Sequence, residues 1–243
     1  MAVPQSSPPP SVAVIERPSS AVRRGGVAGI AFLILLVAQA IVMGQPEKPN
    51  ASASAIADWI AAHRAQGLAS SYVIALASVL FLFFVVALCH RLRDRGADED
   101  LLVVARFSAA LGVAIYLVLS AVQLANVYLV SHTSAEVTKA LYAVVAVGGN
   151  LSGVPYGVFL LLVGWGALRS AAVPRWLGWS ALVVGIGELL VAASFAQSGV
   201  FAASGPVALV GGVILIYVWV LAVSIYLLRP ERKLAQQRSK RAA

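Results

Sequence analysis

The sequence predicts an all-α, polytopic membrane helix bundle with six transmembrane helices, and three observations support this fold class. Of the 243 residues, 60% are hydrophobic and only 12% are charged, whereas a soluble domain is roughly half apolar and one quarter charged. The mean hydropathy is +0.88. Six apolar segments have about 20 residues or more, the length that spans the hydrocarbon core. This composition excludes a disordered chain, and the single cysteine excludes a disulfide framework.

The six predicted spans lie between two tails. Residues 1–24 are rich in proline and serine without an apolar period, so we expect a disordered cytoplasmic N-terminal tail. Residues 25–229 form the membrane domain, and residues 230–243 form a basic cytoplasmic C-terminal tail. The first span, 25–44, is longer than the ~7–15 apolar residues of a signal peptide, so we expect it to be retained. The other predicted spans are 70–89, 102–128, 140–168, 176–196 and 206–228.

A short amphipathic helix is expected in the outer loop between the first two spans. In the stretch SASAIADWIAAHRAQ, apolar residues that include Ile56, Trp59 and Ile60 recur near the helical spacing. Ser52 or Ser54 is a suitable N-cap because a serine side chain accepts a backbone hydrogen bond there. We expect this helix to lie on the outer membrane surface, with Trp59 at the depth of the headgroups.

The distribution of positive charge predicts the orientation. The tails and the loops after the second and fourth spans carry 14 of the 18 basic residues, which places both termini in the cytoplasm. The same residues are expected to attract anionic lipid headgroups. No folded basic module accompanies them, so we do not expect a nucleic-acid partner. Acidic residues before the third span, Asp98 to Asp100, suit the positive end of that helix as caps.

Two charged side chains fall within the predicted spans. Glu188 lies roughly 18 Å from the inner end of its span at 1.5 Å per residue, near the bilayer centre, where an ionisable residue is a functional-site hypothesis by default. Arg106 lies nearer the inner end of its span and can extend to the cytoplasm. We predict an intramembrane polar layer that binds a ligand or a proton, with Tyr217 at a similar depth. Its predicted members are Glu188, Asn150, Tyr156, Gln39, Tyr116 and Arg106.

The fourth span, GGNLSGVPYG at its centre, is expected to be broken. Asn150, Ser152 and Pro155 interrupt an apolar run, and a proline leaves a backbone carbonyl that neighbouring groups must satisfy. Small residues every four positions form a stripe that lets another helix approach closely. That helix can belong to the same chain, to a second copy of the chain or to a membrane partner. The stripe consists of Gly149, Gly153 and Gly157.

Several segments together resemble an uncharacterised bacterial multi-pass integral membrane family of unknown function with about six helices. They are SASAIADWIAAHR, VALCHRLRDRGADED and LRSAAVPRWLGWSALVVGIGELL, and the resemblance covers residues 25–228. It implies a helical bundle in the bacterial inner membrane and assigns no catalytic residue. The PRWLGW stretch also has a physical role, because Trp176 and Trp179 are favoured at the membrane interface.

Three classes of function are compatible with the sequence. We expect an accessory or interaction protein without enzymatic activity or cofactor, in which Glu188 joins helices by hydrogen bonding. The alternative is a small proton-linked transporter or carrier that uses Glu188 in a polar cavity beside the broken helix. An enzyme is the third class, and it would require an outer metal site. Its ligands would be His63, His132, Asp58 and Glu136, from two loops that must converge.

Overall fold

The computed structural model describes residues 20–196, 199–202 and 205–229, and the predicted tails lie almost entirely outside these ranges. Within them the chain is all-α and has no strand. Six helical segments are long and apolar enough to cross a membrane, which confirms the predicted fold class. These segments are α1 (Ser20–Met43), α3 (Arg64–Arg93), α4 (Glu99–Leu129), α5 (Ala135–Leu151) with α6 (Gly153–Ser170), α7 (Arg175–Ala192), and α8 (Pro206–Leu209) with η1 (Val210–Leu215) and α9 (Ile216–Leu228).

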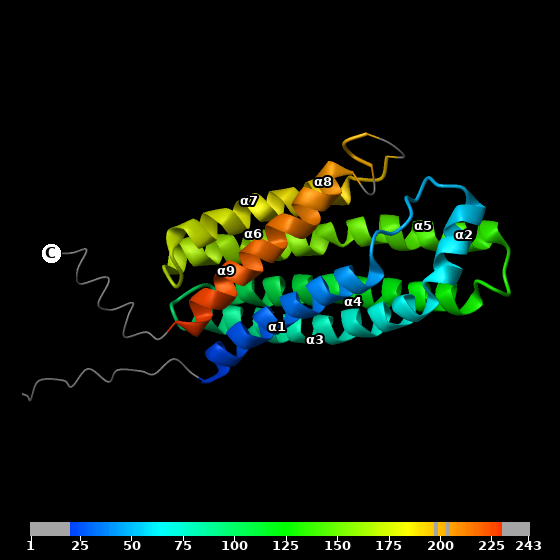
Figure 1. The fold of residues 1–243 in the computed structure, drawn as a ribbon. Coiled ribbons are helices and arrows are strands. Elements are labelled where there is room, and N and C mark those ends of the chain that lie inside the picture. The colour runs from blue at the N-terminus through cyan, green and yellow to red at the C-terminus, as the bar shows by residue number, and fades with distance from the viewer. Residues whose placement is uncertain (1–19, 197–198, 203–204, 230–243) are drawn as a thin grey trace, which may run out of the picture.

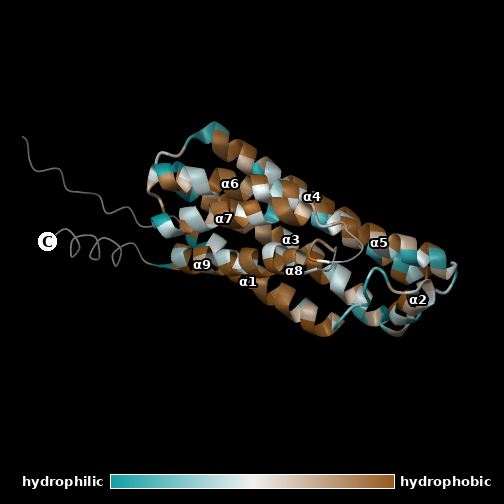
Figure 2. Ribbon diagram, turned by 90° about the horizontal axis from the view of Figure 1, so that it is seen from above, coloured by the Kyte–Doolittle hydropathy of each residue, from teal (hydrophilic) through white to brown (hydrophobic). Residues whose placement is uncertain are grey.

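The long helices run side by side and alternate in direction (Figure 1). Ser20, Leu228 and the α3–α4 and α6–α7 connections lie at one end, which we name the terminal end. The short helix α2 (Ala53–Ala62), the α4–α5 connection and the start of α8 lie toward the other, which we name the α2 end. Hydrophobic residues cover the middle of the long helices, and hydrophilic residues gather near the ends (Figure 2).

The short helix α2 has the predicted cap but covers a different surface from the predicted one. Ser52 accepts a hydrogen bond from the amide of Ala55, as expected for an N-cap. Ile56 and Ile60 are fully buried, and they pack with Val127 of α4. The structure therefore differs from the expectation of a lipid contact for this apolar face, because the face covers helices of the same chain.

The fourth crossing is broken at Ser152, as the sequence predicts. The proline at position 155 has no amide hydrogen, and its ring clashes with the carbonyl four residues earlier, at Leu151, where α5 ends. The hydroxyl of Ser152 donates a hydrogen bond of 2.6 Å to the carbonyl of Gly149 and closes the turn. The two halves of this crossing also differ in packing. Only Thr138 is buried in α5, whereas nine residues of α6 are.

The sixth crossing contains an irregularity in its helix that was not expected from the sequence. A π-helical turn, η1, separates α8 from α9. Gly211 lies in this turn, and a Cβ atom there would stand 3.2 Å from the carbonyl oxygen of Gly187 in α7. The missing side chain therefore permits close approach of the two backbones. Single π turns are rare in proteins as a whole, and those that occur are often at functional sites.

The glycine stripe of the fourth crossing packs within the chain. A Cβ atom on Gly153 would lie 2.3 Å from the carbonyl oxygen of Glu188, and one on Gly157 would lie 2.9 Å from that of Gly185. Two members of the stripe therefore hold α6 against α7 and bring Glu188 next to the helix break. Contact with a second copy of the chain through this stripe stays a prediction.

Candidate functional site

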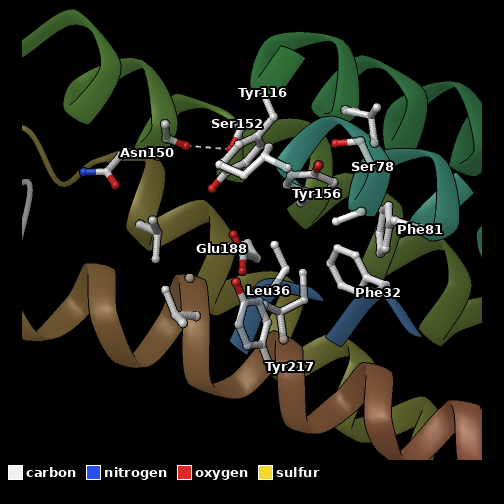
Figure 3. Close-up of a pocket in the computed structure, with 18 of the residues that line it drawn as sticks. Phe32, Leu36, Ser78, Phe81, Tyr116, Asn150, Ser152, Tyr156, Glu188 and Tyr217 are labelled. Atoms are coloured by element: carbon white, nitrogen blue, oxygen red, sulfur yellow. Dashed lines mark hydrogen bonds between the residues drawn. The ribbon is translucent and has the colours of Figure 1, made fainter. Parts of the chain in front are cut away.

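A cavity of about 190 Å³ lies inside the bundle beside the break in the fourth crossing (Figure 3). Residues of every long crossing contribute to its lining, which is apolar apart from one group of polar side chains. Tyr116 both lines the cavity and is 38% exposed, which places it where the cavity meets the outside of the bundle. The polar side chains of the lining are Gln39, Ser78, Tyr116, Asn150, Ser152, Tyr156, Glu188 and Tyr217.

Glu188 is the acidic residue of this lining. It lies thirteen residues after the start of α7, roughly 20 Å along the helix at 1.5 Å per residue. Its side chain is 3% exposed, and its Oε1 atom has no hydrogen-bond partner among the described residues. Figure 3 shows the carboxyl between Tyr116 and Tyr156 on one side and Tyr217 on the other. A buried polar atom without a partner is costly, so this residue is not explained by interhelical hydrogen bonding.

Five aromatic rings form a continuous series along the cavity wall, which we name the aromatic arc. Each ring contacts the next, with centroid distances of 6.0, 5.7, 5.1 and 6.3 Å in order along the arc. The arc begins and ends near the Glu188 carboxyl (Figure 3). In order, its members are Tyr116, Tyr156, Phe81, Phe32 and Tyr217.

The amide side chains of the lining connect helices at the α2 end of the cavity. Gln39 of α1 donates a hydrogen bond of 2.8 Å to the hydroxyl of Ser70 in α3. Asn150 of α5 donates one of 2.7 Å to the carbonyl of Ser194, just after α7. These two contacts join α1 to α3 and α5 to the end of α7, and Gln39 and Asn150 line the same cavity as Glu188.

The structure brings five of the six predicted site residues together. Arg106 is the exception, because it lies about ten residues before Tyr116 on α4, roughly 15 Å nearer the terminal end. Its guanidinium pairs with Glu99, and its Nε donates a hydrogen bond of 3.1 Å to the carbonyl of Leu102. The residues that line the cavity as predicted are Glu188, Asn150, Tyr156, Gln39 and Tyr116.

Sequence reasoning missed the phenylalanines of the arc and placed Tyr217 only by its depth. Phe32 and Phe81 lie in continuous apolar runs, where no pattern separates a cavity-lining ring from one that faces lipid. The paired glycines at 211 and 212 are the signal that would have indicated the irregular sixth crossing. No cluster of three or more potential metal ligands occurs in the described part of the chain, so the outer metal site is not assembled there.

A family model for a domain of unknown function, DUF4386, matches residues 27–229. The chain belongs to this family. The match confirms the resemblance to an uncharacterised membrane family, and no curated protein or solved structure matches the chain. The DUF4386 region contains almost all of the helical bundle and the whole cavity lining. A bundle of six apolar helices in this family fits an integral membrane protein of unknown role.

Proposed function

We propose that this DUF4386 protein is a small proton-linked carrier whose central site is the cavity around Glu188. One observation supports this function above all, namely a 3% exposed carboxyl that lines a cavity and has an oxygen atom without a hydrogen-bond partner among the described residues. A residue that only joined helices would be expected to use both oxygens. The cavity thus favours a carrier over an accessory or interaction protein, and the proposal includes no catalysed reaction.

The proposed mechanism uses Glu188 as the site where a proton is bound and released. An isolated carboxylate buried in an apolar medium is costly, so the empty site holds its carboxyl in the protonated form. The titratable side chains that face it across the cavity are Tyr116 of α4, Tyr156 of α6 and Tyr217 of α9. These tyrosines are neutral near pH 7, since free tyrosine titrates at about pH 10, and they leave the charge of the site to Glu188.

Two irregular helices provide the flexibility that a carrier requires. The break at Ser152 and the π turn at 210–215 both border the cavity, on different walls. Thr138 is the one buried residue of α5, so few fully buried contacts oppose a movement of this segment, which would break the hydrogen bond from Asn150 to Ser194. We propose that α5 moves about Ser152 and opens the site toward the α2 end. Broken helices at a midplane site are common in transporters.

Accessibility of position 188 from both sides of the membrane tests the carrier proposal. We expect Glu188→Cys, with the buried native Cys89 replaced by alanine, to react with a membrane-impermeant methanethiosulfonate in reconstituted vesicles. The reaction should occur whether the reagent is outside the vesicles or trapped inside, because a carrier opens alternately to each side. Mass spectrometry of the intact protein measures the modified fraction.

Two cysteine variants serve as controls for this experiment. Ile186→Cys lies on the same helix at a 54% exposed position away from the cavity lining, so a charged reagent should not reach it through lipid. Ser54→Cys lies in α2 and should react from one side only. Reaction of the Glu188→Cys variant from a single side, or from neither, would overturn the carrier proposal.

We further propose that the protein lies in the bacterial inner membrane with its terminal end in the cytoplasm. Support comes from the basic residues of the described chain, because Arg93, Arg169, Arg175 and Arg229 all lie at or near the terminal end. Anionic headgroups are the proposed partners of this basic end.

A reporter that is active only in the cytoplasm tests this orientation. Fused after Ala243 it should be active, whereas fused after Ala62, at the end of α2, it should be inactive. The opposite pattern would reverse the orientation.

A further inference from the structure

We infer that the cavity binds a small organic ammonium ion, whose charge is paired with Glu188 and whose alkyl groups contact the aromatic arc. This inference rests on the proposed carrier function and names its substrate class.

The charge of the lining points to a cation. Glu188 is the one acidic side chain among the described residues that line the cavity, and none of those residues is Lys, Arg or His. An anion would therefore meet no positive side chain there, and it would be repelled by an ionised carboxyl. The carboxyl of Glu188, whose Oε1 atom has no hydrogen-bond partner among the described residues, is the group whose negative charge would pair with a cationic ligand.

The aromatic arc suits an organic cation better than a metal ion. Aromatic faces within about 6 Å attract ammonium groups, and rings arranged as a cage recognise quaternary ammonium. The rings of Phe32, Phe81 and Tyr156 follow one another at 5.1 and 5.7 Å and all three line the cavity, so we expect a ligand paired with Glu188 to contact more than one of them. Hard divalent metal ions instead take about six or more oxygen ligands, which this largely apolar lining does not supply.

The volume limits the size of the ion. A cavity of about 150 Å³ holds benzene, which has six carbon atoms. The 190 Å³ of this cavity therefore suits an ion of about seven non-hydrogen atoms. Tetramethylammonium and choline satisfy this limit, whereas tetrabutylammonium exceeds it.

Binding of the ion is balanced by release of a proton. In the empty state Glu188 carries its proton and the site is neutral. When the ammonium ion enters, the carboxyl O–H bond breaks, the proton passes to water, and the carboxylate pairs with the cation. The site is neutral in both states, so each crossing of the membrane avoids an unpaired buried charge. The carrier would thus exchange one ammonium ion for one proton.

Calorimetric titration of the purified protein in detergent tests the ligand class. Choline should bind, and its uncharged isostere 3,3-dimethylbutan-1-ol should bind at least tenfold more weakly. Titrations in two buffers of different ionisation enthalpy should show release of one proton per choline. As long as the Glu188 carboxyl of the protein without choline is protonated, the affinity for choline should rise by up to about tenfold for each unit of pH.

Matched variants connect this binding to the cavity. Glu188→Gln should abolish choline binding, whereas Glu136→Gln, at an exposed position on α5, should leave it unchanged. Tyr217→Leu should weaken binding about thirtyfold, the order of a cation–π contact with a desolvated ion. The corresponding change at Tyr72, which is 68% exposed on α3, should have no effect.

The outcomes separate this inference from the carrier proposal. Equal affinity for choline and its isostere, unchanged binding by Glu188→Gln, or no saturable binding of tetramethylammonium or choline would overturn the ammonium site. If position 188 is reached from both sides but no ammonium ion binds, the carrier proposal stands and the ligand class is wrong. If choline binds as described but position 188 is reached from one side only, the ligand class stands and the carrier proposal fails.

Discussion

Replacement of Gly153 by alanine is expected to destabilise the bundle. The new Cβ would lie 2.3 Å from the carbonyl oxygen of Glu188 and 3.2 Å from the amide nitrogen of Ala192. Both atoms belong to the backbone of α7, so no side-chain rotation relieves the clash and the two helices must separate. Overpacking of this kind costs about 1–3 kcal/mol. For a chain of this size that lowers the thermal midpoint by about 2–12 °C.

Gly149→Ala is the matched control for this prediction. It changes the same residue type one helical turn earlier, at a position where a Cβ would meet nothing within 4 Å. Alanine is favoured over glycine in a helix by about 0.5–1 kcal/mol, so this variant should unfold at the same temperature or a higher one. Thermal unfolding in detergent, followed by intrinsic fluorescence, compares the two. Equal midpoints for both variants would show that α6 and α7 do not touch at Gly153.

Replacement of Glu188 by leucine is expected to raise the thermal stability of the protein and to abolish choline binding. The Oε1 atom of Glu188 is buried without a hydrogen-bond partner among the described residues, and such a group costs about 1–3 kcal/mol. Leucine fills a similar volume without a polar atom. The thermal midpoint should therefore rise by about 2–12 °C, since natural proteins commonly keep a destabilised functional site.

Glu188→Gln provides the comparison that separates function from packing. Glutamine keeps the shape and a polar group but cannot ionise to release a proton, so it should abolish proton-linked binding with little gain in stability. A carboxyl that joined helices by hydrogen bonding would behave in the opposite way, because leucine would then lower the midpoint. A lower midpoint for Glu188→Leu than for Glu188→Gln would therefore indicate a structural role.

The elements that could be predicted are those that depend on local composition. Runs of about 20 apolar residues predict the crossings, and the break near Pro155 follows from the missing amide hydrogen of proline. The depth of Glu188 follows from counting residues at a fixed helical rise. Depth alone placed Gln39, Tyr116 and Tyr156 in one layer, and all three line the cavity.

Other features depend on contacts that no local pattern encodes. The face of α2 that contains Ile56 is amphipathic in the same way whether it covers lipid or protein, and the structure shows that it covers Val127. Arg106 lies on the same helix as Tyr116, yet it pairs with Glu99 at the terminal end. The π turn at 210–215 has a local signal in the paired glycines at 211 and 212, but the close contact of Gly211 with α7 is a tertiary feature.

The sequence by itself determined that this chain has six apolar crossings and that one acidic residue lies near their midpoint, since hydrocarbon length and helical rise convert residue number into depth. Only the tertiary structure decided which side of each helix faces inward. The long helices are apolar on every face, so no polar stripe marks their inner side. Glycine contacts such as that of Gly153 with Glu188 set those rotations, and they thereby enclose one carboxyl and five aromatic rings around a single cavity.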